Sequence, residues 1–174
     1  MHELILNQEI YEKVIREAIP AARRFVWIAT ADLKDLHVHG PGKLFIPFTA
    51  VLAELVRRGV EVRIIHAKEP GPRFRRDFDK YPELFESERF EQILCPRMHM
   101  KCVVIDGKSA YLGSANLTGA GMGAKGKHRR NFELGVFTDD KDYLAQLMAF
   151  YDAMWLGENC PACQRRDVCP APIA

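Results

Sequence analysis

The chain has 174 residues, of which 48% are hydrophobic and 28% charged, and its formal net charge is +2. This length and composition predict one globular domain with a substantial core, and the weak positive charge permits a polyanionic partner without demanding one. No apolar run reaches the roughly 18–20 residues that cross a bilayer, and MHELILNQEI does not resemble a signal peptide. We therefore expect a cytoplasmic protein without a transmembrane segment. Five cysteines, an odd number, argue against a disulfide framework.

Helical and strand patterns alternate along the chain. Apolar residues at helical spacing predict a first helix over residues 10–19, with Asn7 as its N-cap and Pro20 at its end. Further patterns predict helices over 44–58 and 141–156, strands over 25–29, 60–65, 98–105, 110–115 and 132–137, and loops over 30–43, 69–89 and 119–130, the second of which includes a short helix. This alternation predicts an α/β fold, with a mixed β-sheet flanked by helices.

A group of polar residues lies in the stretch RMHMKCVVIDGKSAYLGSAN. Side chains two residues apart on a strand share a face, so His99 would point the same way as Lys101, and Ser114 the same way as Asn116. Paired as a hairpin, the two strands would bring these groups to one end of a sheet. A histidine can act as a nucleophile or general acid and base, and lysine and asparagine can hold phosphate oxygens. Asp106 has the wrong strand parity to join them, which places it at the turn in an orienting or structural role.

A solvated polar hairpin would explain a lone His-x-Lys, but the full spacing H-x-K-x4-D-x6-G-S-x-N is much rarer by chance. It resembles the complete HKD motif of the phospholipase D superfamily, and the matching residues are His99, Lys101, Asp106, Gly113, Ser114 and Asn116. RRGVEVRII before the motif and RNFELGVF after it also resemble segments of that superfamily, and the glutamate of the second is Glu133. The resemblance extends over residues 8–156 and implies a phospholipase D-like catalytic domain over residues 1–157.

The resemblance implies a phosphodiester transfer that needs no metal. One histidine attacks phosphorus and forms a phosphohistidine, and a second histidine protonates the leaving oxygen and then activates water. Active sites of the superfamily carry two such motifs, and this chain has one, because the downstream pattern is missing after its other histidines. Small single-motif members take the second motif from another chain. We therefore expect a homodimer in which His99 of both chains meet at a twofold axis, with Glu133 accepting a hydrogen bond from His99.

A basic, glycine-rich segment follows the motif. Its candidate substrate-binding residues are Lys125, Lys127, Arg129 and Arg130, which we expect to contact a nucleic-acid backbone, although a plain solvated loop is an alternative. Small single-motif relatives are mostly nucleases, so the resemblance favours an endonuclease that cleaves DNA or RNA. A phospholipase D-type lipid hydrolase is one alternative, for which the apolar run FIPF could supply an entry surface. A non-catalytic nucleic-acid-binding module is the other, and the complete motif disfavours it.

Residues 158–174 form a separate tail in which Cys160, Cys163 and Cys169 have the spacing C-x2-C-x5-C. Three thiolates this close together suggest a metal site. The spacing resembles the last three ligands of the iron–sulfur loop in endonuclease III-type DNA glycosylases, whose first ligand would fall at Ala153 here. A fourth ligand must come from elsewhere. Cys95 is the candidate, because Cys102 is expected in the core.

Four thiolates suit either a [4Fe–4S] cluster or zinc, and zinc would also accept three thiolates and a histidine such as His66. Free thiols on a frayed tail are the alternative. Because the chemistry expected at His99 needs no metal, we expect a structural role for this centre. A ligand at Cys95 would hold the tail against the strand that leads into His99.

Overall fold

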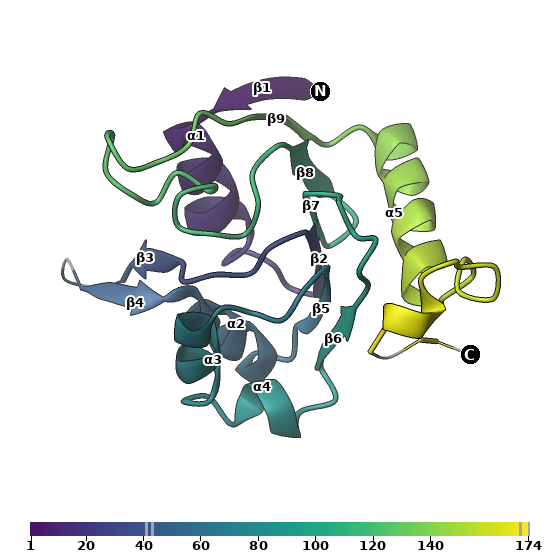
Figure 1. Ribbon diagram of the computed structural model, residues 1–174. Coiled ribbons are helices and arrows are strands. Elements are labelled where there is room, and N and C mark those ends of the chain that lie inside the picture. The colour runs from purple at the N-terminus through teal and green to yellow at the C-terminus, as the bar shows by residue number, and fades with distance from the viewer. Residues whose placement is uncertain (41, 43, 171, 174) are drawn as a thin grey trace.

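The chain folds around a mixed sheet, seen nearly edge-on in Figure 1. The computed structural model describes residues 1–40, 42, 44–170 and 172–173, and within them the sheet has seven strands in the order β1-β9-β8-β7-β2-β5-β6. Their bounds are β1 His2–Leu6, β2 Phe25–Thr30, β5 Glu61–His66, β6 Phe90–Leu94, β7 Cys102–Ile105, β8 Ser109–Gly113 and β9 Leu134–Thr138. Strands β2, β5 and β6 run parallel, and β7, β8, β9 and β1 continue the sheet in antiparallel pairs. The predicted α/β class and mixed sheet are confirmed.

Helices cover both faces of the sheet (Figure 1). On one side lie α1 (Gln8–Ile10), which continues as the π-helix η1 (Tyr11–Ala18), then α2 (Phe48–Arg57) and α3 (Pro72–Phe78), with α4 (Glu83–Glu86) below them. On the other side lies α5 (Lys141–Trp155), and the tail that follows it contains one short 3-10 turn, η3 (Arg166–Val168). A small separate hairpin joins β3 (His37–His39) to β4 (Phe45–Pro47).

The central strand β2 shows why both faces are covered. Its sequence FVWIAT is apolar on both sides, as expected of a strand buried between two layers. Val26 and Ile28 enter the core under the first group of helices, whereas Trp27 packs on the α5 side. Tyr151 of α5 stacks on Trp27 at a ring-centroid distance of 5.1 Å, and its hydroxyl donates to the Ile28 carbonyl at 3.2 Å. This contact fixes α5 to the middle of the sheet.

The structure corrects several predicted boundaries. Strand β7 begins at Cys102 and β8 ends at Gly113, so the polar residues of the motif flank these strands instead of lying within them. Residues 45–47, predicted as the start of a helix, form β4. The loop predicted over residues 30–43 contains β3, and its positions 41 and 43 lie outside the described residues. Asn7 occupies the N-cap position of α1 as predicted, but its φ is +49° and its side chain makes no capping hydrogen bond.

Two outer strands, β1 and β6, were not predicted at all. Each lies at an end of the strand order and pairs on one side only, β1 with β9 and β6 with β5. Their short segments HELIL and FEQIL mix polar and apolar residues, so the partner strand decides their conformation more than local propensity does. These strands complete the sheet in which the polar motif flanks the ends of β7 and β8.

Candidate active site

Four polar residues of the motif, His99, Lys101, Ser114 and Asn116, lie at one end of the strands of the sheet. The parallel strands β2, β5 and β6 end there, and β7 begins there. His99 and Lys101 lead into β7, whereas Ser114 leaves β8. The Gly113 amide donates to the Lys101 carbonyl at 3.1 Å, so the two segments stay paired as far as the site. The carboxyl ends of parallel strands are a common position for ligand sites in α/β proteins.

His99 and Lys101 face the solvent differently. The His99 side chain is exposed, and the Lys101 side chain is half-buried with its ammonium donating to the His99 carbonyl oxygen at 2.7 Å. Burial lowers the pKa of Lys101, and the negative charge of Glu133 acts in the opposite direction. The Lys101 ammonium therefore lies beside the backbone of the one histidine of the motif, and the negative charge of Glu133 favours the protonated form of this lysine.

Asn116 is oriented by the end of β2. Its side-chain oxygen accepts hydrogen bonds from the Ala31 amide at 3.1 Å and from the Thr30 hydroxyl at 3.3 Å. The same Thr30 hydroxyl oxygen accepts from the Leu117 amide at 3.0 Å. Because the Asn116 oxygen is occupied, its NH2 group is left to donate to a ligand oxygen. The spacing of the motif does not indicate Thr30, although a polar residue at the end of an apolar strand is a signal for it.

Glu133 belongs to a separate hydrogen-bonded group. Its carboxylate accepts from the Ser114 hydroxyl and, at 3.0 Å, from the side-chain amide of Asn131. Its backbone amide donates to the Asn7 side-chain oxygen at 3.0 Å. The expected hydrogen bond between His99 and Glu133 is not formed in the part of the chain that the structure describes, where the side chains that donate to this carboxylate are Ser114 and Asn131. The side chain of Asn7, at the N-cap position of α1, thus supports the site instead of making a capping hydrogen bond.

Asp106 lies at the opposite end of β7 from His99. Its carboxylate accepts hydrogen bonds from the amides of Arg23, Arg24 and Phe25 at 2.8–3.2 Å, at the start of β2. Burial alone would raise the pKa of Asp106, but these backbone hydrogen bonds hold it below its ordinary value. Its φ is +56°, the left-handed conformation that suits the turn before Gly107. The geometry agrees with the structural role expected from strand parity.

The glycine of the motif makes room for a buried tyrosine. Gly113 and Gly135 are register partners on β8 and β9, and the ring of Tyr111 packs across both. A Cβ atom on Gly113 would lie 2.5 Å from the Leu134 carbonyl oxygen and closer still to the Tyr111 hydroxyl. That hydroxyl accepts from the Ala115 amide at 3.3 Å, and burial raises the pKa of Tyr111 to about 12. This packing sets the path of the chain between Gly113 and Asn116.

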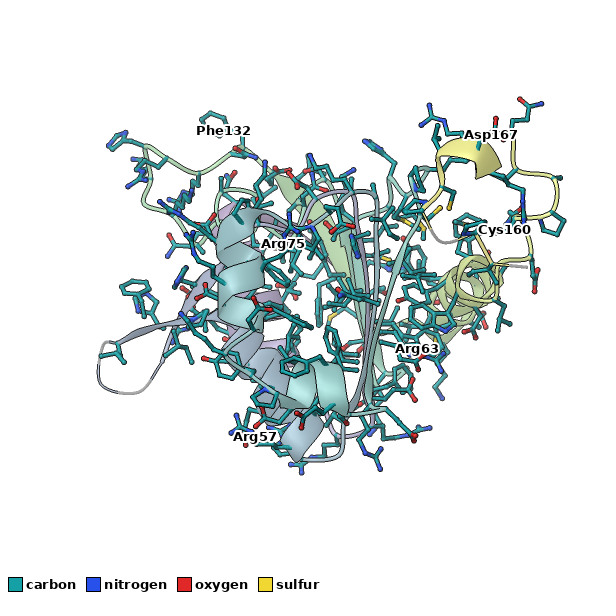
Figure 2. The ribbon with its side chains drawn as sticks, turned by 60° about the horizontal axis from the view of Figure 1, so that its bottom comes forward. Arg57, Arg63, Arg75, Phe132, Cys160 and Asp167 are labelled. Carbon is teal, nitrogen blue, oxygen red and sulfur yellow. The ribbon has the colours of Figure 1, made fainter. Side chains whose placement is uncertain are left out.

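The basic loop joins two parts of the site. It runs from the segment after Asn116 to Glu133, and Phe132 stands at its exposed end (Figure 2). Lys127 and Arg129 are exposed, whereas Lys125 is half-buried, and half-buried Arg130 donates to the Gln8 side-chain oxygen at 2.7 Å. None of these four cations forms an ion pair with another residue that the structure describes. Their charges remain available to a polyanion.

The four candidate metal ligands line one cavity, of about 360 Å³. Cys95, Cys160, Cys163 and Cys169 contribute to its wall, as does His99. Among the residues described, however, no three His, Cys, Asp or Glu side chains are gathered so as to hold a metal ion. Cys102 is buried in the core as expected, and burial raises its pKa to about 12. The metal site stays a prediction.

His66, the alternative fourth ligand, is buried at the end of β5, with its Nδ1 atom 2.8 Å from the Lys68 carbonyl oxygen.

None of the helices formed by the described residues is both long enough and apolar enough to span a bilayer.

Sequence comparison gives the family. Residues 15–155 match the family described as "Cardiolipin synthase, PLD-like domain". Cardiolipin synthase A of Pseudomonas putida (strain W619) is 30% identical over 146 residues, which cover 80% of this chain. The same stretch covers 27% of that relative, so the chain spans about a quarter of the length of the curated relatives it matches.

Solved structures agree in fold. NucT from Helicobacter pylori has a TM-score of 0.64 and 20% identity, covering 89% of this chain and 95% of that one. Nuc from Salmonella typhimurium, a phospholipase D family member, has a TM-score of 0.63 and 14% identity, covering 89% and 93%. The archaeal chromatin protein TrmBL2 has a TM-score of 0.58 and 15% identity, covering 88% and 51%. His99, Lys101, Ser114 and Asn116 of the motif lie together at one end of the sheet, and the family match covers most of the chain. The chain therefore belongs to the phospholipase D superfamily, whose members cleave or transfer phosphodiesters.

Proposed function

We propose that this protein is a metal-independent phosphodiesterase, an endonuclease that cleaves DNA or RNA through a phosphohistidine at His99. The observation that carries the proposal is the exposed His99 at the sheet edge, with the Lys101 ammonium and the oriented Asn116 amide from the same motif at that edge. A nucleophile at the same end of the sheet as two groups that can hold non-bridging phosphate oxygens supplies the functional groups that phosphodiester transfer needs.

In the first step a ring nitrogen of His99 attacks phosphorus, and the bond from phosphorus to the leaving oxygen breaks. An alkoxide is a poor leaving group, so this oxygen takes a proton from a general acid. In the second step the group that acted as general acid takes a proton from water, the water oxygen attacks phosphorus, and the bond between phosphorus and His99 breaks. Lys101 and Asn116 stabilise the charge on the phosphoryl oxygens in both steps. The motif supplies one histidine, and the second role falls to His99 of a second chain.

An exposed apolar surface beside the site fits a second copy of the chain. It consists of Leu4, Leu6, Phe132 and Leu134, which are 62%, 43%, 97% and 56% exposed. Leu6 and Leu134 are register partners on β1 and β9, so they share one face of the sheet. Phe132 and Leu134 flank Glu133 in the chain, so this surface adjoins the Ser114–Glu133 pair. Exposed apolar groups of this kind are typical of interfaces, and a twofold dimer would both cover them and complete the site.

Nucleic acid is the substrate class that the surface charges favour. Lys127 and Arg129 are exposed on the loop that runs between Asn116 and Glu133. Cations at the rim of a phosphodiesterase site bind a polyanionic backbone independently of sequence. DNA binding is also named for TrmBL2, one of the proteins of similar fold. DNA and RNA share the phosphodiester that this surface would contact, so both remain within the proposal.

A lipid substrate is the second candidate. The observation that favours it is the cavity at His99, whose wall includes Met98, Met100, Phe150 and Met154 and is mainly apolar. The relatives named cardiolipin synthase A point the same way. An apolar pocket next to the nucleophile suits an acyl chain better than it suits a polyanion.

The deciding experiment measures turnover in EDTA on single- and double-stranded DNA, RNA and phosphatidylcholine vesicles. The wild-type protein is compared with His99→Ala and with the control His37→Ala, which removes a histidine outside the motif. We expect cleavage of nucleic acid that His99→Ala abolishes and His37→Ala retains, with a labelled phosphohistidine trapped in the wild type. Turnover of phosphatidylcholine alone would overturn the nuclease proposal. Binding of nucleic acid without any turnover would overturn the enzymatic one.

The shared site has its own test. Wild-type and His99→Ala chains are co-expressed in different ratios, and nucleic-acid cleavage is measured per total protein. If two chains build one site, activity falls with the square of the wild-type fraction, because a mixed dimer holds a single histidine. Activity that falls in simple proportion, or an active monomer by light scattering, would contradict the shared site.

A further inference from the structure

The C-terminal tail turns its cysteines inward. Between residues 158 and 170 no side chain is fully buried, and the half-buried ones are Cys160, Cys163, Arg166 and Cys169. The tail lies beyond α5, with Cys160 and Asp167 on the same side of the molecule (Figure 2). Ordering each residue costs about 1–2 kcal/mol in backbone entropy. Half-buried Ile173, which follows this segment, lies against Gly157 and lines the cavity described above. Something other than an apolar core must hold such a tail in place.

A fourth cysteine faces the tail from the catalytic domain. Cys95 follows β6 and begins a turn in which the Met98 amide donates to the Cys95 carbonyl at 2.8 Å. Its own amide donates to the His66 carbonyl at 2.8 Å, which ties the turn to the end of β5. Cys95 and the three tail cysteines line the same cavity of about 360 Å³. Two segments far apart in sequence thus present four thiols to one space.

Hydrogen-bond donors and positive charge accompany these sulfurs. The Arg97 guanidinium donates to the Cys163 sulfur at 3.7 Å, and the Arg165 amide donates to it at 3.4 Å. The Arg166 guanidinium donates to the Cys160 carbonyl at 3.0 Å and so lies within the same loop. Donors to sulfur and nearby cations stabilise metal-bound thiolates, which carry a net negative charge. Neutral free thiols would need neither.

We propose that Cys95, Cys160, Cys163 and Cys169 bind a metal centre through four thiolates, and that this centre fastens the tail to the turn that carries His99. Four sulfurs around zinc lie about 2.3 Å from the ion and leave no open space between them. Apolar residues such as Met98 and Phe150 also line this cavity, and among the described residues no three His, Cys, Asp or Glu side chains are gathered so as to hold a single metal ion. A [4Fe–4S] cluster uses four cysteines around a group of several atoms, so its ligand sulfurs lie farther apart than those around one zinc ion. We therefore expect iron and sulfide in preference to zinc.

The position of the centre gives it a consequence for the proposed active site. The turn that begins at Cys95 leads directly into His99, which lines the same cavity. A ligand bond at Cys95 restricts the turn and hence the approach of the His99 ring. Cys95 is in this respect a positioning residue, and this consequence rests on the proposed function, whereas the metal centre itself does not.

The test measures metal content without substrate. The full chain is produced with iron and sulfide available and purified without oxygen, and iron, acid-labile sulfide and zinc are determined per chain together with the visible spectrum. The variants are Cys95→Ser and Cys163→Ser, and the control is Cys102→Ala, a cysteine buried in the core. We expect stoichiometric iron and sulfide in the wild type and in Cys102→Ala, and their loss in both serine variants.

Zinc with the same cysteine dependence would uphold the four-thiolate site and overturn the cluster. A metal-free chain, or metal retained in Cys95→Ser, would overturn the site. Hydrogen exchange guards against misfolding, because removal of the metal by a chelator should release protection in residues 158–170 and in the turn after Cys95 but not in β2. Since none of these measurements uses turnover, a failure of the nuclease proposal would leave them unaffected.

Discussion

Replacing Asp106 with alanine should destabilise the protein while leaving the histidine site able to work. The Asp106 carboxylate accepts hydrogen bonds from three backbone amides, those of Arg23, Arg24 and Phe25, and thereby joins the turn after β7 to the start of β2. It lies at the end of β7 opposite to His99. The substitution therefore separates a structural contribution from a chemical one within a single sequence motif.

The size of the effect follows from these contacts. A hydrogen bond to a charged acceptor contributes about 1.5–3 kcal/mol, so three such bonds at the lower value set a loss of about 4.5 kcal/mol. Amides at a strand end regain some hydrogen bonding to water, which reduces the loss, but alanine at a φ of +56° adds about 1 kcal/mol of strain. We expect the free energy of unfolding to fall by about 3–4 kcal/mol. Asp106→Asn keeps the shape and tolerates the left-handed conformation, so its loss should be smaller.

Urea unfolding followed by circular dichroism measures the free energy of unfolding, and cleavage per folded molecule is measured on the same samples at low temperature. We expect Asp106→Ala to lower the midpoint strongly and to retain turnover per folded molecule. An unchanged midpoint would refute the assignment of these hydrogen bonds as stabilising. A stable variant without turnover would show that Asp106 takes part in the chemistry.

Three further results are expected. The pKa of Asp106 in the folded protein is depressed below its ordinary 3.8, so its contribution to stability is present above that value and is lost as the pH falls through the lower folded pKa. Asp106→Asn should remove this part of the acid dependence of stability, as measured by urea midpoints at different pH values. An identical pH profile in the variant would contradict this expectation. Gly135→Ala should cost about 2 kcal/mol or more, because its methyl group meets the Tyr111 ring, whereas Gly126→Ala, with open space around it, should be neutral; equal melting temperatures would refute the packing argument. The double variant Lys127→Ala with Arg129→Ala should reduce the slope of the logarithm of the DNA-binding constant against the logarithm of salt concentration by about one per residue. Hydrolysis of a small soluble diester should be unchanged. An unaltered slope would exclude the loop from the interface with DNA.

Much of the site was predictable because its geometry is local. Alternation along a strand places neighbours on opposite faces, and it correctly put Cys102 in the core and Asp106 at the turn. The spacing of the motif was enough to identify the superfamily and to indicate that His99, Lys101 and Asn116 belong together. These inferences need only the chain between residues 97 and 116, where the covalent connection itself limits how far apart the groups can lie.

Other features depend on which segments pair through space. Asn7 supports Glu133 because β1 adds to the sheet beside β9, and Thr30 orients Asn116 because β2 ends next to the chain that leaves β8. The partner of Glu133 proved to be Ser114, not His99. No local pattern encodes these contacts, since each joins residues separated by long stretches of chain whose relative positions follow from the strand order. By itself the sequence determined which chemical groups the protein carries and on which side of a strand they lie, and only the tertiary structure, through strand pairing and core packing, decided which of those groups meet.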